Sequence, residues 1–219
     1  MVKYGAMETG KGKFITFEGG EGAGKSTQVK RLQAELEALG REVVLTREPG
    51  GTRLAELVRG LLKDETQDPP CRRAELLLFL AARAQLVENV IRPALDAGKI
   101  VISDRFSDST FAYQGYGRGL PLDAIKAAND FACGGLEPDI TLYLDVEPSV
   151  SLARRAAREA ATNTSADRFE REGGDFHARL REGFNTLAKE NPQRIVRIDA
   201  NGTPGQVWEN IWKSIKHML

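Results

Sequence analysis

The chain has 219 residues, a length that suits one α/β domain with a large buried core. Apolar residues make up 41% and charged residues 28%, which is typical of a soluble globular protein. Lysine plus arginine and aspartate plus glutamate both number 31, so the formal net charge is zero. The basic excess of a nucleic-acid-binding protein is missing, although small basic clusters can still hold small phosphates.

The ends and the cysteines indicate a cytoplasmic protein. Residues 1–12 contain glycine and lysine but no apolar stretch of a signal peptide, so they are predicted to form a flexible N-terminal tail. No apolar run approaches the length of a membrane span, and no membrane association is expected. Cys71 and Cys133 have neither a disulfide framework nor metal-site spacing, which favours a reducing compartment.

Short apolar runs alternate with helical patterns along the chain. The runs predicted to be strands are 14–17, 43–45, 100–102, 140–144 and 195–198. Helices are predicted to begin at about Lys25, after Gly51, and at about Arg72, Ser149, Asp175 and Pro204. This alternation predicts an α/β fold, a doubly wound, five-stranded parallel sheet flanked by helices, in one domain over residues 13–219.

Three segments carry more detailed expectations. The helix after Gly51 is predicted to bury Leu54, Leu57, Val58, Leu61 and Leu62. The long helix is predicted to span about residues 72–97, with Pro93 kinking or ending it. Residues of about 154–174 are predicted to form a mobile lid, because 159–174 is the least regular stretch of the chain.

A phosphate-binding loop lies between the first predicted strand and the first helix. Gly19-Gly20-Glu21-Gly22-Ala23-Gly24-Lys25-Ser26 fits the pattern G-x-x-x-x-G-K-[ST] without deviation. In this pattern, backbone N–H groups and the helix N-terminus face the phosphates of a nucleotide. The Lys25 ammonium reaches the β- and γ-phosphates, and the Ser26 hydroxyl contacts magnesium. The sequence therefore predicts a P-loop NTPase fold that binds ATP and Mg²⁺.

The third predicted strand ends in Asp104-Arg105, where a second magnesium contact is expected. An acid at this end of a strand commonly holds the metal of P-loop enzymes, through water. The planar fork of Arg105 suits the phosphates of both donor and acceptor. A surface ion pair between the two residues is the simpler alternative, but their place after a buried strand favours the functional interpretation.

Other classes of P-loop protein fit the sequence less well. A GTP-dependent switch needs an Asn-Lys-x-Asp element that reads guanine, and the chain has none. Motor and nucleic-acid ATPases usually have longer chains or basic tracks. A kinase for a small acceptor is the leading interpretation. A nucleoside kinase, with Glu18 as its base, and a regulatory P-loop ATPase remain as alternatives.

Several segments resemble bacterial thymidylate kinases, in the expected order and over nearly the whole chain. They are Phe17 to Thr27, Thr46 to Thr52, Asp104 to Gly115, and Asp167-Arg168-Phe169-Glu170. The resemblance implies transfer of the γ-phosphate of ATP to dTMP, giving dTDP and ADP in dTTP biosynthesis. It also implies an ATP site over residues 19–27 and, commonly, a homodimer.

The resemblance further implies roles for individual acceptor-site residues. Phe79 stacks on thymine, Arg83 binds at the base or its phosphate, and Pro49 packs near the thymine methyl group. Arg47 grips the acceptor phosphate. The remaining substrate contacts are Glu21 to the 3′-hydroxyl, Thr110 and Gln114 to the base edge, Tyr113 against C2′, and Arg105 to phosphate. From spacing alone, a core position among the neighbouring leucines is the favoured interpretation of Phe79, and the resemblance reverses it.

The lid is expected to supply a catalytic arginine, because the P-loop has none. Arg154 and Arg158 are four residues apart and therefore share a helix face. We expect Arg158 to act with Lys25 and Arg105 on the transferring group and Arg154 to lie nearer the adenine, with Arg168 as an alternative. A solvated helix face is the simpler interpretation of such a charge run.

The long helix carries an apolar set that fits either a dimer interface or the core. Its members are Leu76, Leu80, Val87 and Ile91. The sequence leaves these two interpretations open.

Overall fold

The computed structural model describes residues 12–63, 69–162, 168–169 and 171–218. Residues 1–11 of the predicted tail lie outside the described residues. Gly12 already belongs to the folded part, because it is buried and its N–H donates to the Leu95 carbonyl at 3.1 Å. Within the described chain, no helix is both long and apolar enough to cross a membrane.

The predicted five-stranded parallel sheet is confirmed. Its strands are β1 (Lys13–Glu18), β2 (Val43–Arg47), β3 (Ile100–Asp104), β4 (Ile140–Asp145) and β5 (Ile195–Asp199). They lie in the order β2-β3-β1-β4-β5, and every pair is parallel. The chain therefore winds outward from β1 in both directions, and the loops after β1, β3 and β4 meet at the carboxyl edge. Ligands bind at this switch point in open α/β sheets.

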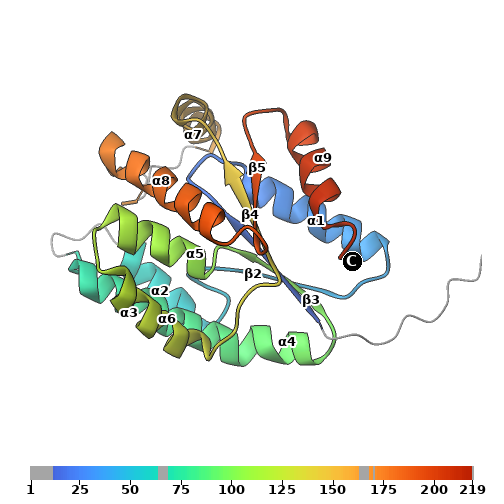
Figure 1. Ribbon diagram of the computed structural model, residues 1–219, viewed down its shortest axis with the longest axis horizontal. Helices are drawn as coiled ribbons and strands as arrows, with labels where there is room; N and C mark the ends of the chain where they lie inside the picture. Colours follow the sequence, from blue (N-terminus) through green and yellow to red (C-terminus); the bar gives the residue numbers. More distant parts are fainter. Residues whose placement is uncertain (1–11, 64–68, 163–167, 170, 219) are drawn as a thin grey trace, which may run out of the picture.

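Helices α1 (Lys25–Ala38) and α9 (Pro204–Ile215) cover one face of the sheet (Figure 1). Side chains alternate across each strand, so Ile15 and Phe17 of β1 point to this face. They pack with Val29 and Leu32 of α1 and with Ile211 of α9. A capping box of Thr203 and Gln206 fixes the start of α9. This core holds the helix that begins in the P-loop.

A long helical run covers part of the opposite face, made of α3 (Arg72–Leu86), the π-helical turn η1 (Val87–Ile91) and α4 (Arg92–Asp96). Pro93 lies in the first turn of α4, where its missing N–H is tolerated. The predicted helix over 72–97 is therefore present as three joined pieces. Leu76, Leu80, Val87 and Ile91 are at most 8% exposed. Core burial, and not a dimer interface, explains that set.

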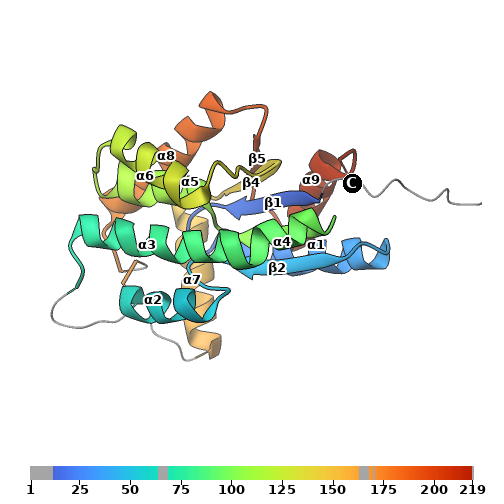
Figure 2. The same cartoon turned by 90° about the horizontal axis from the view of Figure 1, so that it is seen from below.

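The predicted buried stripe of α2 (Arg53–Lys63) is only partly right. Val58 and Leu62 are buried, but three leucines face solvent. They are Leu54, Leu57 and Leu61, at 46%, 63% and 58% exposure. Because α2 packs mainly against α3, away from the sheet, only one narrow stripe is covered, and Ala55 completes it. Figure 2 shows α2 beside α3 at the end toward which β1 and β2 point.

Four more helical segments complete the fold. They are α5 (Ser107–Thr110) with the π-helical η2 (Phe111–Gly117), α6 (Leu122–Cys133), α7 (Pro148–Thr162) and α8 (Gly174–Glu190). Helix α8 packs on η2 and on the sheet near β5. The sequence had not singled out α6 as an element. The α5–η2 run is helical, so Thr110 and Tyr113, three residues apart, share one face.

Candidate active site

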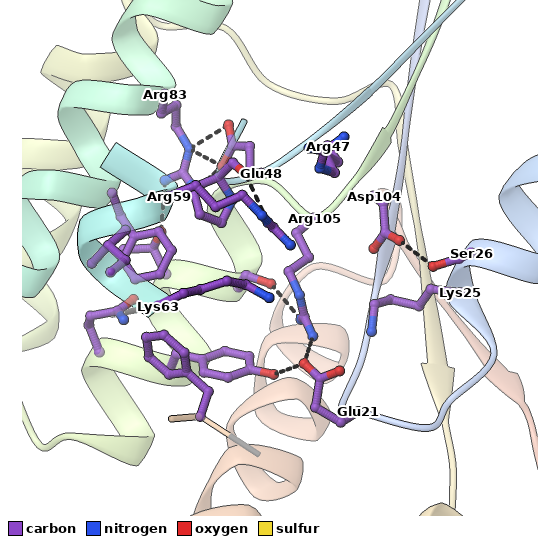
Figure 3. A pocket seen from close by; sticks show the side chains of 18 of the residues that line it. Glu21, Lys25, Ser26, Arg47, Glu48, Arg59, Lys63, Arg83, Asp104 and Arg105 are labelled. Carbon is purple, nitrogen blue, oxygen red and sulfur yellow. Dashed lines mark hydrogen bonds and ion pairs between the residues drawn. The ribbon is translucent and has the colours of Figure 1, made fainter. Parts of the chain in front are cut away.

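Two cavities open side by side at the carboxyl edge of the sheet, on either side of the P-loop. The first has a volume of about 300 Å³ and lies between the P-loop, the β2–α2 region, α3 and α5–η2 (Figure 3). The second, of about 430 Å³, lies between the P-loop, α7 and the start of α9. Glu21, Lys25, Ser26 and Arg158 line both. Two ligands bound in these cavities would therefore meet over the P-loop.

The P-loop has the backbone that its glycines predict. Gly19 and Gly24 have φ angles of 133° and 88°, which side-chain-bearing residues rarely adopt. A Cβ on Gly19 would lie 2.4 Å from the Leu144 carbonyl oxygen, so the loop is packed against β4. The Lys25 ammonium lies in the mouth of the loop and donates to the carbonyls of Gly19 and Gly20, at 3.1 and 2.9 Å. Burial and the nearby Arg105 lower the pKa of Lys25.

Ser26 and Asp104 meet across the carboxyl edge. The Ser26 hydroxyl donates to the Asp104 carboxylate at 3.0 Å (Figure 3). Both groups are hard oxygen donors, the kind that magnesium prefers when it also binds substrate phosphates. No cluster of three or more His, Cys, Asp or Glu side chains suited to a metal occurs among the described residues. The pair therefore fits an ion shared with a nucleotide and not an all-protein metal cage.

Arg105 and Glu21 form an ion pair on the wall of the first cavity. Arg105 Nη2 lies 2.6 Å from Glu21 Oε1, and Arg105 Nη1 donates to the Gly19 carbonyl at 2.9 Å. The guanidinium also covers the Tyr113 ring, 5.0 Å from its centroid. Burial alone would raise the pKa of Glu21, but the charges of Arg105 and Lys25 outweigh it and hold that pKa at about 2. A carboxylate in a loop that holds anions is electrostatically costly unless it meets a cation, and Arg105 is that cation for Glu21.

Arg83 is fixed before any ligand arrives. Only 1% exposed, it donates to both oxygens of Glu48, to Thr110 Oγ1 at 2.8 Å and to Asn129 Oδ1 at 2.7 Å. These bonds occupy four of the five N–H groups of the guanidinium, and the fifth is on Nη2. Arg83 lines the first cavity. Its position suits one directed hydrogen bond to a ligand better than bidentate phosphate binding.

The predicted base-site residues lie together on the wall of the first cavity. Thr110, Tyr113 and Gln114 line it from α5–η2, and Phe79 lines it from α3. Phe79 is half-buried and forms an edge contact with Phe169, with ring centroids 5.9 Å apart. It belongs both to the packing around α2 and to the cavity wall.

The other predicted acceptor residues, Arg47 and Pro49, also line this cavity. The guanidinium of Arg47 pairs with both oxygens of Glu56, at 2.9 and 3.0 Å, and half of the Arg47 side chain is exposed. Arg47 is thus held at the rim of the cavity by a surface ion pair.

Glu18 has a structural position and does not line either cavity. It is fully buried at the end of β1 and accepts from the backbone N–H groups of Phe106 and Ser109, at 2.8 and 3.1 Å. The Ser109 hydroxyl donates to its other oxygen at 2.5 Å. Burial, followed by the charge of Asp108, raises the pKa of Glu18 to about 7. Glu18 therefore anchors the start of α5 and is too enclosed to act as the base of a nucleoside kinase.

The arginines that the sequence assigned to a lid separate in space. Arg154 donates to the carbonyls of Ala200 and Gly202, both at 2.9 Å, at the edge of the second cavity. Arg158 lines both cavities. Arg168 instead donates to Glu75 on α3, at 2.5 Å. Among these three, Arg158 alone borders the junction of the cavities, where a transferred group would pass.

Comparison with known proteins decides the family. The sequence model described as Thymidylate kinase matches residues 17–211. The chain belongs to the thymidylate kinase family. A thymidylate kinase of Nitratidesulfovibrio vulgaris is 49% identical over 94% of this chain and 97% of its own length. One from a Synechococcus species is 51% identical over 94% and 96%. The crystal structure of the Ehrlichia chaffeensis thymidylate kinase superposes with a TM-score of 0.74 at 38% identity, covering 94% and 99% of the two chains.

This member of the thymidylate kinase family has site residues that sequence reasoning missed. Figure 3 shows Arg59 and Lys63 reaching from α2 toward the first cavity, which both residues line. Their spacing of four on one helix face was the available signal. Seven cationic and three acidic side chains line the cavity, so it favours an anionic ligand. Glu48 and Phe169 were also missed, because their roles depend on contacts with other elements.

Proposed function

We propose that the chain transfers the γ-phosphoryl group of ATP to dTMP, forming ADP and dTDP on the route to dTTP. The observation that carries this proposal is the meeting of two cavities at one P-loop, in a chain of the thymidylate kinase family. One cavity has a base-sized wall of aromatic and amide side chains with a cationic rim. The other runs from the P-loop toward Arg154 and α9. The first suits the acceptor and the second suits ATP.

On the donor side, residues 19–27 hold the phosphates and Arg154 borders the adenine. The P-loop amides and Lys25 face the β- and γ-phosphates. The Lys25 ammonium bonds to the Gly19 and Gly20 carbonyls at the mouth of the loop, where phosphate oxygens of ATP would take their place. Arg154 already bonds to carbonyls at the far end of the second cavity, which supports a role at the base of ATP.

On the acceptor side, side chains of the cavity wall would contact the base, the sugar and the phosphate of dTMP. Phe79 stacks on thymine, Pro49 packs near its methyl group, and Thr110, Gln114 and Arg83 contact the base edge. Along the sugar and phosphate, the proposed contacts are Tyr113 at C2′, Glu21 at the 3′-hydroxyl, and Arg47 with Arg105 at the phosphate. All of these side chains line the first cavity.

Ser26 and Asp104 are the proposed magnesium contacts, Asp104 through water. Bound there, Mg²⁺ would neutralise charge on the β- and γ-phosphates. The hydrogen bond of 3.0 Å between the two side chains supports this assignment, because it brings two oxygen donors to the mouth of the P-loop. Loss of activity on chelation, restored by added Mg²⁺, is the expected behaviour.

Catalysis on this site is positioning and charge neutralisation. The phosphate oxygen of dTMP is already anionic at neutral pH, so the reaction needs no general base, and Glu18 is not positioned to be one. Lys25 and Arg158 line both cavities and Arg105 lines the first, and together they neutralise the transferring group. Closure of a lid over residues 154–174 would exclude water and bring Arg158 to the γ-phosphate.

We also propose that the protein is a cytoplasmic homodimer. The four apolar residues of the long helix, Leu76, Leu80, Val87 and Ile91, are buried within one chain and are therefore not the proposed interface. Leu54, Leu57 and Leu61 of α2 and Leu77 of α3 are between 46% and 63% exposed, and α2 packs against α3. This leucine surface supports association of two copies. Sedimentation tests this association: the wild type should have the mass of a dimer and Leu57→Glu that of a monomer. The same mass for both proteins would contradict the proposed surface.

A coupled assay with ATP and a panel of monophosphates tests the reaction. We expect dTMP-dependent ADP release with dTDP as the product, and little activity with thymidine. Phosphorylation of a nucleoside, or ATP hydrolysis that ignores every acceptor, would contradict the proposal. The first result would favour a nucleoside kinase and the second a regulatory ATPase.

A further inference from the structure

The Glu75 carboxylate accepts from three side chains, two at η2 and one at Arg168. It lies on α3 behind the wall of the first cavity, and 2% of its side chain is exposed. Gln114 Nε2 donates to Oε1 at 3.0 Å, Arg118 Nε donates to Oε1 at 3.2 Å, and Arg168 Nη2 donates to Oε2 at 2.5 Å. A buried carboxylate with two guanidinium partners is common as structure. Its remaining partner, Gln114, belongs to the proposed base site, so Glu75 can influence how the base is bound.

The contact with Glu75 fixes which way the Gln114 amide faces. A carboxylate that two guanidinium groups already bond acts as an acceptor toward all three partners. The atom of Gln114 that meets Glu75 must therefore be the amide nitrogen, at 3.0 Å. This leaves the carbonyl oxygen of Gln114 as the acceptor on the cavity side of the amide. Without the carboxylate, the amide could turn over and present a donor instead.

That orientation matters for the choice of base. Thymine carries a hydrogen on N3, which needs an acceptor, whereas N3 of cytosine is itself an acceptor. An amide oxygen facing N3 therefore binds thymine and repels cytosine. A site that hydrogen-bonds its substrate rejects an analogue strongly, because a mismatched buried polar group stays unpaired.

The same carboxylate holds the described end of the lid. Arg168 is bonded to Glu75, and the next residue, Phe169, packs edge-on against Tyr113 with ring centroids 6.1 Å apart. Arg118 bridges Glu75 to Glu172, which follows in the lid. One buried acid thus contacts a base-reading residue on one side and the lid on the other.

We propose that Glu75 is a positioning residue that sets base specificity and ties it to lid closure. It orients Gln114 to accept from N3 of thymine and it holds Arg168, so the lid closes on a correctly occupied base site. This inference rests on the proposed assignment of dTMP to the first cavity.

Glu75→Gln tests whether Glu75 sets the preference for thymine over cytosine. The ratio of kcat/KM for dTMP to that for dCMP should fall about tenfold, the scale of one buried hydrogen bond that becomes a mismatch. Gln114→Glu places two acceptors against each other and should weaken dTMP binding at least as much. In the double variant Glu75→Gln with Gln114→Glu, position 75 donates to position 114, whose other oxygen faces N3, and the new carboxylate also replaces the one that Arg118 loses at position 75. This variant should recover the thymine preference, which general damage to packing would not allow.

Hydrogen–deuterium exchange of the segment 171–180 tests whether Glu75 and Arg168 couple the base site to the lid. Addition of dTMP should slow exchange there in the wild type and in the control Glu172→Gln, which keeps Glu75 and Arg168 paired. Addition of dTMP should not slow exchange in Arg168→Ala, although the ratio of kcat/KM for dTMP to that for dCMP should be unchanged in this variant. If Glu75→Gln does not fold, the dTMP affinities of Gln114→Glu and of the double variant still test the proposal. Only the double variant should regain the affinity that Gln114→Glu loses.

The failures of the two proposals are separable. A wild-type enzyme without dTMP kinase activity would overturn the proposed function. An active wild type overturns this inference alone if its base ratio survives Glu75→Gln, or if the swapped pair does not regain the thymine preference. A dTMP-induced protection of the lid that persists in Arg168→Ala would overturn the link to lid closure.

Discussion

Arg83 and Glu48 form an ion pair that is almost closed to solvent. Arg83 Nη2 lies 2.5 Å from Glu48 Oε2, and the two side chains are 1% and 4% exposed. Glu48 follows β2 and Arg83 lies on α3, so the pair joins the loop that carries Pro49 to the helix that carries Phe79. Both sides of the base site are held by this contact before any ligand binds.

Removal of the Glu48 charge should destabilise the protein strongly. Glu48→Gln leaves a buried guanidinium without its counter-charge, which costs about 3–5 kcal/mol in comparable cases. The free energy of unfolding from urea titration measures this loss. The control Glu56→Gln breaks the half-exposed pair with Arg47 and should cost less than about 1 kcal/mol. Equal effects of the two substitutions would contradict the importance of the buried pair.

Tyr113 should decide between deoxyribose and ribose. Its ring is 8% exposed and is held by Arg105 on one side and by Phe169, Phe176 and Phe184 around it. A ring fixed in this way cannot move aside for a 2′-hydroxyl. We expect wild type to prefer dTMP strongly over its ribose counterpart, and Tyr113→Ala to narrow that ratio of kcat/KM. Tyr113→Phe removes the hydroxyl, with its 3.4 Å contact to Glu21 and its interaction with Arg105, but keeps the ring and should keep the ratio.

Tyr113→Ala should also lower the stability of the protein. Truncation to alanine also leaves a cavity, with a cost of about 3–5 kcal/mol. Activities should therefore be compared well below the melting temperature of the variant. Wild type that uses both sugars equally would make Tyr113 a packing residue only.

The sequence predicted most of the architecture, because strand and helix periods and the P-loop pattern are local signals. It could not predict which leucines of α2 are covered, since that depends on α2 packing against α3 rather than on the sheet. Glu18 shows the same limit within the site. From the sequence it was a candidate base, but its burial and its bonds to Phe106 and Ser109 appear only when β1 and α5 meet.

Glu18 should make stability depend on pH. Burial and the charge of Asp108 raise its pKa from 4.5 to about 7, although Arg105 and the bonds from Ser109 and Phe106 oppose the rise. The folded protein therefore holds a proton on Glu18 that the unfolded chain loses at lower pH. Stability from this group is fully present below about pH 4.5 and is lost as the pH rises through about 7.

Glu18→Gln tests this linkage. The amide keeps an acceptor for the backbone N–H groups and does not ionise. The free energy of unfolding of the variant minus that of wild type should increase between pH 4.5 and 7. The increase should be on the order of 3 kcal/mol and should level off above that window. A difference that is flat with pH would show that Glu18 titrates normally in the folded protein.

Arg158 should act on the transition state. It lines both cavities, and the P-loop offers no arginine of its own. Arg158→Ala should lower kcat about 10³-fold, within the range for arginines that neutralise a transferring phosphoryl group. The affinity for dTMP, measured by calorimetry, should hardly change. Arg155→Ala is the matched control on the same helix, since Arg155 lines neither cavity. A loss of ATP affinity with kcat preserved would instead make Arg158 a ground-state contact.

The most direct test of the central claim follows the phosphoryl group itself. The protein is incubated with ATP labelled at the γ-phosphorus, with Mg²⁺ and dTMP, and the products are separated. We expect the label to appear in dTDP in step with ADP formation, and folded Lys25→Met to transfer almost none. Label released as free phosphate at the same rate with or without dTMP would contradict it.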